Sequence, residues 1–165
     1  MEKSESKANG ISEQPSEWEL MERRDEGQIL AELKGHYLEE FVYSFEQAGR
    51  RVIGLSWAGV KECAYRLGGI AVEHCEVLDV GDAWRCIAKA VNKADGSSRW
   101  GACQQPKTIK YRSGGEAPDE FALQKAVSKA QRNAIRALLP EVFIKTMIDR
   151  FLEEKRRAAD FGKAP

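Results

Sequence analysis

Several signatures of common protein classes are missing from this 165-residue sequence. No apolar run approaches the roughly 20 residues that a membrane-spanning helix needs. The first 27 residues are polar and acidic, without the apolar segment of an export signal. These absences favour a cytoplasmic protein, and the length favours one domain plus tails.

Patterns typical of metal sites and disulfide frameworks are also absent. The cysteines stand at 63, 75, 86 and 103, so none forms a C-x-x-C pair, and the two histidines are His36 and His74. Zinc ligands usually come in close pairs, and disulfide frameworks suit smaller secreted chains. We therefore expect no metal and four reduced thiols, mostly packed as small hydrophobic side chains.

Motifs of enzymes are equally scarce. The sequence contains no phosphate loop, no G-x-G-x-x-G and no H-E-x-x-H. Four acidic residues could suggest a metal-dependent nuclease: Glu73, Glu76, Asp79 and Asp82. They fall on a predicted strand and its turn, where exposed acids are ordinary, and no lysine is suitably placed beside them. The sequence thus predicts a protein that is not an enzyme and uses no cofactor, with a nuclease as the least favoured alternative.

Hydrophobic periodicity predicts an α+β fold. The expected order is a β-hairpin (38–45 and 50–55), a helix at 57–67, a three-stranded antiparallel meander (70–80, 83–94 and 98–104), a polar loop at 105–118, a long basic helix at 119–139 packed on the sheet, and a further helix at 141–157. Ser56 is the expected N-cap of the first helix, and Gly68-Gly69 its end. The expected domains are a disordered acidic tail at 1–27, a core at 28–140, and a C-terminal helix with a short tail at 141–165.

Charge is unevenly distributed along the chain. Its 26 basic and 26 acidic residues cancel, but residues 1–50 carry six Lys/Arg against twelve Asp/Glu. Residues 96–140 carry eight basic residues against three acidic ones. A neutral protein with one basic third can still hold a polyanion, because the local field governs encounter and binding.

The long helix concentrates this basic charge on one face. On a helical wheel, three cations fall within about 40° of Lys125: Lys129, Arg132 and Arg136. No acidic residue lies between Phe121 and Pro140, so like charges four residues apart repel without compensation. This pattern favours an outward-facing phosphate-binding surface, with an ordinary solvated face as the alternative.

A second basic cluster precedes the helix. It comprises Arg99, Lys107, Lys110 and Arg112, with Trp100 and Tyr111 interleaved. Cations beside aromatic rings are typical of grooves that bind single-stranded nucleic acid, where bases stack on the rings. Core packing is the alternative for Trp100.

The order of elements and two segments resemble the single-strand annealing proteins of the Rad52 superfamily. GLSWAGVKECAYRLGG (54–69) is similar to that family's turn and glycine-ended helix, and FALQKAVSKAQRNAIRALLP (121–140) to its long helix. The resemblance covers about residues 35–140. Family members often carry a basic residue in the turn that opens the first helix, where this chain has Ala58 and Gly59.

The resemblance implies a homo-oligomeric ring or filament that binds single-stranded DNA in an outer, positively charged groove. It implies strand annealing without ATP, with DNA contacts at Lys125, Lys129, Arg132 and Arg136. A recombinase or another ssDNA-binding protein is a candidate partner, and the expected location is the cytoplasm, for a nucleoid-associated protein or for an intracellular one encoded by a virus.

The expected function is therefore non-enzymatic binding and annealing of single-stranded DNA in recombination and repair. One alternative is a general DNA- or RNA-binding protein without annealing activity. Another is a scaffold whose basic helix docks an acidic partner. The acidic segment 1–50 could itself be that partner, covering the groove in cis or on a neighbouring subunit.

Overall fold

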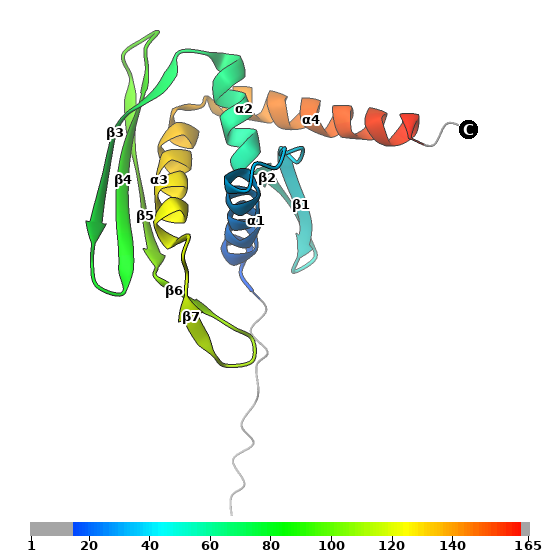
Figure 1. Ribbon diagram of the computed structural model, residues 1–165. Coiled ribbons are helices and arrows are strands. Elements are labelled where there is room, and N and C mark those ends of the chain that lie inside the picture. Colours follow the sequence, from blue (N-terminus) through cyan, green and yellow to red (C-terminus); the bar gives the residue numbers. More distant parts are fainter. Residues whose placement is uncertain (1–14, 163–165) are drawn as a thin grey trace, which may run out of the picture.

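The computed structural model describes residues 15–162 and shows an α+β fold (Figure 1). The elements are α1 (Glu17–Leu33), β1 (Val42–Gln47), β2 (Arg50–Leu55), α2 (Trp57–Leu67), β3 (Ile70–Asp79), β4 (Ala83–Asn92), β5 (Ser98–Pro106), β6 (Thr108–Lys110), β7 (Glu116–Pro118), α3 (Ala122–Leu138) and α4 (Glu141–Phe161). Strands β1–β2 and β6–β7 form two-stranded hairpins, and β3-β4-β5 form an antiparallel sheet.

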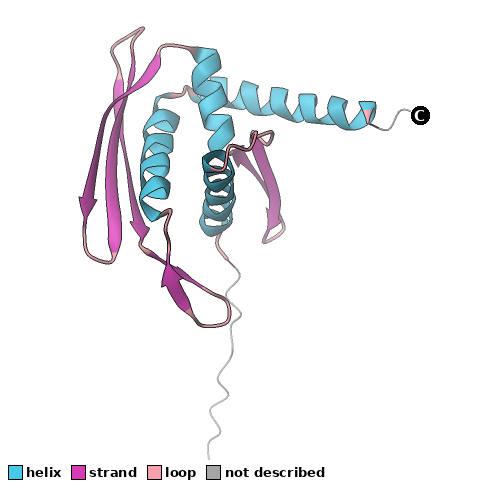
Figure 2. Cartoon of the chain, in the orientation of Figure 1, coloured by secondary structure: helices cyan, strands magenta, loops and turns pink. Residues whose placement is uncertain are grey.

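The elements lie in layers (Figure 2). Helix α3 covers one face of the β3-β4-β5 sheet (Figure 1). Helices α1 and α2 lie on the side of α3 that faces away from the sheet, between α3 and the β1–β2 hairpin (Figure 1). Helix α4 leaves the body of the domain as an arm (Figure 1). The basic helix is therefore central to the fold, with the sheet on one side and α1 on the other.

Small residues bring α3 close to the sheet. Ala126, Ala130 and Ala134 are completely buried against Cys86, Ala88 and Ala90 of β4 in one of the two hydrophobic clusters. A Cβ atom added to Gly101 of β5 would lie 2.3 Å from the backbone nitrogen of Ala134. Because no larger side chain fits between these backbones, the alanine spacing fixes which face of α3 meets the sheet.

The second hydrophobic cluster joins the hairpin, α2 and α4. It is built on Val42, Leu55, Val60, Ile144 and Phe151. Ser56 caps α2 by accepting a hydrogen bond from the backbone N–H of Gly59 at 3.1 Å. The core thus has one part under the sheet and one under the hairpin, and α3 reaches both.

Most of the elements predicted from the sequence are confirmed. The hairpin, the helix at 57–67, the meander and the two C-terminal helices lie where periodicity places them, within a few residues. The predicted loop at 105–118 is wrong in part, because β6 and β7 pair within it. No helix in the described part of the chain has the length and apolar character to cross a membrane.

The predicted tail at 1–27 is wrong for residues 17–27, which form most of α1. This helix begins with a capping box, in which Ser16 accepts from the backbone N–H of Glu19 and the Glu19 side chain accepts from the N–H of Ser16. Residues 28–33, placed in the predicted core, continue the same helix to its end. Residues 1–14 lie outside the described part of the chain.

Candidate nucleic-acid interface

The four basic residues of α3 form a continuous row, here named the α3 cationic row: Lys125, Lys129, Arg132 and Arg136. Their spacing of four, three and four residues keeps them on one side of the helix, as the sequence predicts. However, they do not form a solvent-exposed ridge. Lys125, Lys129 and Arg132 are only 4–5% exposed, and Arg136 alone is half-exposed.

Helix α1 covers the row with three carboxylates, here named the α1 acidic face: Glu22, Asp25 and Glu26. Glu22 lies 2.7 Å from both Lys129 and Arg132. Glu26 lies 2.6 Å from Lys129 and 3.7 Å from Lys125. The charge that the sequence leaves uncompensated within α3 is therefore compensated by a helix about 100 residues away in the chain.

Further hydrogen bonds complete this buried network. Lys125 donates to Asp119 at 2.7 Å, just before the start of α3. Lys129 also donates to the side-chain oxygen of Gln105 at 2.9 Å, and Arg132 donates to the side chain of Asn133. Buried charges need such partners, since each unpaired charge would cost several kcal/mol, roughly 3–5 when one partner of a pair is removed.

The pKa values of the network follow from burial and pairing. Burial alone would lower the pKa of Lys129, but hydrogen bonds to Glu22 and Glu26 outweigh it, so the pKa is raised above 10.5. Burial similarly opposes the charge of Arg132, and its attraction to Glu22 and Asp25 raises the pKa. Burial raises the pKa of Asp25 despite the opposing influence of Arg132. The raised pKa values keep Lys129 and Arg132 charged, whereas burial disfavours the charge of the Asp25 carboxylate.

The C-terminal half of α1 holds the buried apolar anchor of the helix, whereas its N-terminal half is held mainly by charged and polar contacts. Ile29 is the fully buried hydrophobic residue of the helix. Gln28 accepts from the backbone N–H of Ala58 at 2.9 Å and donates to the carbonyl of Glu40 at 2.6 Å. Towards the N-terminus, Trp18 is 58% exposed and meets the guanidinium of Arg132 at 6.0 Å from its ring centre.

A cavity lies on each side of α1. One, of about 580 Å³, lies between α1, the β1–β2 hairpin, α3 and α4, and includes Arg132 and Arg136 in its lining. The other, of about 620 Å³, lies between α1, β5 and β6, and includes Lys125 and Lys129. Trp18 of α1 lines both. Helix α1 therefore lies within a groove whose floor is the α3 cationic row.

The second predicted cluster lies partly beside this groove. Lys110, Tyr111 and Arg112 are exposed at the turn of the β6–β7 hairpin, whose Thr108 and Ile109 line the larger cavity. Lys107 pairs with Asp79 at 2.6 Å and lies over the ring of Trp84. Arg99, on β5, is exposed and donates to the carbonyl of Ser98.

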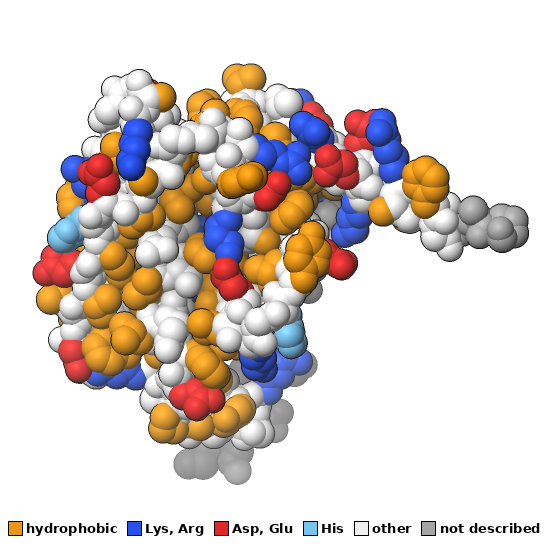
Figure 3. Space-filling model, turned by 45° about the horizontal axis from the view of Figure 1, so that its top comes forward, with side chains coloured by type: hydrophobic (Ala, Val, Ile, Leu, Met, Phe, Trp, Pro, Cys, Tyr) orange, Lys and Arg blue, Asp and Glu red, His pale blue; other side chains and the backbone are white. Residues whose placement is uncertain are grey.

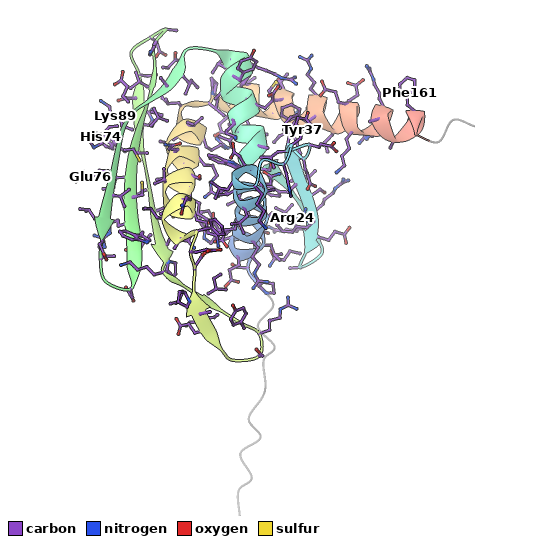
Figure 4. All side chains as sticks on the ribbon, in the orientation of Figure 1. Arg24, Tyr37, His74, Glu76, Lys89 and Phe161 are labelled. Atoms are coloured by element: carbon purple, nitrogen blue, oxygen red, sulfur yellow. The ribbon has the colours of Figure 1, made fainter. Side chains whose placement is uncertain are left out.

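Trp100 lies elsewhere. It is 58% exposed on the outer face of the sheet, with Lys89 at 5.9 Å from its ring centre and His74 edge-on to it. Figure 4 shows that His74, Glu76 and Lys89 point away from α3. The alternative of core packing for Trp100 is therefore wrong, but the structure does not bring Trp100 together with the α3 cationic row.

On the face shown in Figure 3, basic side chains are scattered among acidic and hydrophobic ones and form no single patch. The α3 cationic row itself is largely buried beneath α1. Its cover could have been found in the sequence, because Glu22, Asp25, Glu26 and Ile29 follow helical spacing after a Ser-x-x-Glu capping box.

The cysteines do not form a site of their own. Cys63 and Cys86 are buried, Cys103 is half-buried and Cys75 is exposed, and all four are free thiols. Burial raises the pKa of Cys63 to about 11. Within residues 15–162 no cluster of three or more His, Cys, Asp or Glu side chains is arranged to hold a metal ion.

Comparison with models of known protein families finds no family that matches this chain, and comparison with curated proteins finds no matching relative.

Proposed function

We propose that this protein binds single-stranded DNA in the groove over α3 and promotes annealing of complementary strands without catalysing a covalent step. The observation that carries the proposal is the α3 cationic row, whose four cations lie along one helix face and line the two cavities beside α1. Phosphates, like carboxylates, are bound through charge-assisted hydrogen bonds from Lys and Arg. The chain's own carboxylates thus occupy positions that suit the phosphates of a strand.

The dimensions of the row suit a short stretch of nucleic acid. From Lys125 to Arg136 the helix rises about 16 Å, the length of roughly four or five phosphates at duplex spacing. The exposed Lys110 and Arg112 near one side of the groove would extend the path, and Tyr111 between them offers a ring for base stacking.

Assembly into a homo-oligomer is part of the proposal. Strand β3 is an edge strand of ten residues, and its side chains from Glu73 to Asp79 are exposed. Helix α4 projects from the domain with Phe161, near its end, 83% exposed (Figure 4). Unpaired edges and exposed aromatic residues are typical of surfaces that meet another chain.

The test is a binding titration with a fluorescently labelled oligothymidylate, followed by anisotropy at several salt concentrations. Four phosphate contacts predict that the logarithm of affinity falls against the logarithm of salt concentration with a slope of about −3. Duplex DNA and single-stranded RNA in parallel titrations separate a DNA-specific protein from a general nucleic-acid binder.

A matched set of variants assigns the site. Lys129→Gln with Arg132→Gln removes two cations, and adding Glu22→Gln and Asp25→Asn restores the original net charge and neutralises their most buried partners, while Glu26 keeps its pair with Lys125. This quadruple variant avoids the unpaired carboxylates that would unfold the double variant. We expect it to fold and to lose affinity for the oligonucleotide. Wild-type affinity in the folded quadruple variant would place the binding site elsewhere.

One observation favours a second function, a scaffold that docks an acidic protein segment. The α3 cationic row already binds an acidic helix, and its pairs with Glu22, Asp25 and Glu26 show that carboxylates at helical spacing fit it. Titration with a synthetic peptide of residues 15–27 against a chain lacking residues 1–27 tests this function. Saturable peptide binding without oligonucleotide binding would favour the scaffold.

A further inference from the structure

We infer that the N-terminal half of α1, residues 17–26, is an intramolecular competitor that single-stranded DNA displaces from the α3 cationic row. The inference rests on the proposed function and adds its regulation. In the closed state seen in the structure, Glu22 and Glu26 hold the cations that a strand would bind. A DNA phosphate and these carboxylates cannot contact Lys129 at the same time, so binding requires opening.

The way in which α1 is attached favours this role. Its first half is held mainly by charged side chains: Glu22, Asp25 and Glu26 pair with the α3 cationic row, and Asp25 also accepts from the backbone N–H of Trp57 in α2. Its second half holds the apolar anchor Ile29 and the hydrogen bonds of Gln28 to α2 and the loop before β1. A polyanion can replace charged contacts one for one, whereas it offers nothing in place of a buried isoleucine.

Gly27 separates the two halves. It lies inside the helix, is exposed, and an added Cβ atom would have no neighbour within 4 Å. Packing therefore does not require a glycine here, although glycine weakens the interior of a helix relative to alanine. A flexible position at this point allows residues 17–26 to leave while residues 28–33 stay in place.

The cavities on both sides of α1 indicate which surface becomes accessible when residues 17–26 leave the α3 cationic row. The cavity of about 580 Å³ contains Arg132 and Arg136, and that of about 620 Å³ contains Lys125 and Lys129. The N-terminal half of α1 lines both, through Trp18 and the α1 acidic face. Its departure would join the cavities into one groove with all four cations on the floor.

The experiment compares the affinity of four full-length chains for a labelled oligothymidylate. Glu22→Gln with Glu26→Gln weakens the closed state, and we expect about tenfold tighter binding, because apparent affinity scales with the fraction of open molecules. Gly27→Ala strengthens the helix in the closed state, and we expect about fivefold weaker binding. Glu46→Gln with Glu73→Gln is the control, since it makes the same change in net charge at exposed residues of β1 and β3.

Hydrogen exchange measures the displacement directly. With oligonucleotide bound to the wild-type chain, we expect backbone amides of residues 17–26 to lose protection while those of residues 28–33 keep it. Unchanged protection of residues 17–26, together with equal affinities for all four chains, would overturn the inference and leave the proposed function standing.

A different result would overturn the function itself. If neither the wild type nor Glu22→Gln with Glu26→Gln binds the oligonucleotide, the row does not bind single-stranded DNA and the competitor has nothing to compete with. Gly27→Ala is expected to be at least as stable as the wild type, so its binding result is decisive even if the glutamine variant fails to fold.

Discussion

The guanidinium of Arg132 donates a hydrogen bond to the carboxylate of Asp25 at 2.5 Å, and the other oxygen of that carboxylate accepts from the backbone N–H of Trp57 at 2.8 Å. One buried side chain thus joins α1, α2 and α3. Both members of the pair are almost completely buried, so the contact is a structural junction as well as part of the candidate site.

Breaking this junction on one side should be costly. Arg132→Met leaves Asp25 buried without its main partner, and we expect a loss of about 3–5 kcal/mol in the free energy of unfolding. Adding Asp25→Asn should recover part of the loss, because no uncompensated charge remains. Urea denaturation measures both. As a control, Glu153→Gln removes an exposed pair with Arg157 and should cost no more than about 0.5 kcal/mol.

Deleting residues 1–27 tests whether α1 belongs to the folded domain. A disordered tail could be removed without effect. This deletion, however, removes the whole α1 acidic face and leaves three buried cations either exposed or without their carboxylate partners. We expect the free energy of unfolding to fall by at least about 3 kcal/mol. The same deletion in a chain with Lys129→Gln and Arg132→Gln should cost less. A melting temperature unaffected by the deletion would contradict the packing of α1.

The contact between α3 and the sheet should tolerate no added atoms. Ala130→Leu inserts a large side chain where Ala130 is completely buried, and Gly101→Ala places a methyl group 2.4 Å from the carbonyl oxygen of Ala130. We expect each to cost about 1–3 kcal/mol, measured by thermal or urea unfolding. Gln131→Leu, at a half-buried position one residue along, should cost less. Equal costs at positions 130 and 131 would mean that a different face of α3 meets the sheet.

Alkaline pH should weaken the docking of α1. The pKa of Lys129 is raised above 10.5 by its pairing with Glu22 and Glu26, after the opposing influence of burial. A raised lysine pKa gives stability that is fully present below about 10.5 and is lost as pH rises through the folded-state value. Urea midpoints measured from pH 9 to 12 should therefore fall more steeply above 10.5 in the wild type than in Lys129→Met. Parallel curves would contradict this role of Lys129.

The sequence by itself determined the local structure of this protein. Ser56 and the Gly68-Gly69 pair bound α2, the alternation of Trp84 to Val91 makes a strand with one buried face, and the alanines of α3 mark the side that meets the sheet. These features follow from short-range geometry, in which neighbouring residues decide the backbone conformation and the buried face. The α+β fold with its hairpin and meander was predictable for the same reason.

Only the tertiary structure decided the environment of the α3 cationic row. Helical spacing places Lys125, Lys129 and Arg132 on one face, but it does not say what faces them. That depends on Glu22, Asp25 and Glu26, which reach the row because Ile29 and Gln28 dock α1 beside α2. Long-range pairing of charges has no period in the sequence. The same row could therefore have been a solvated surface, and packing across about 100 residues of chain made it a covered groove.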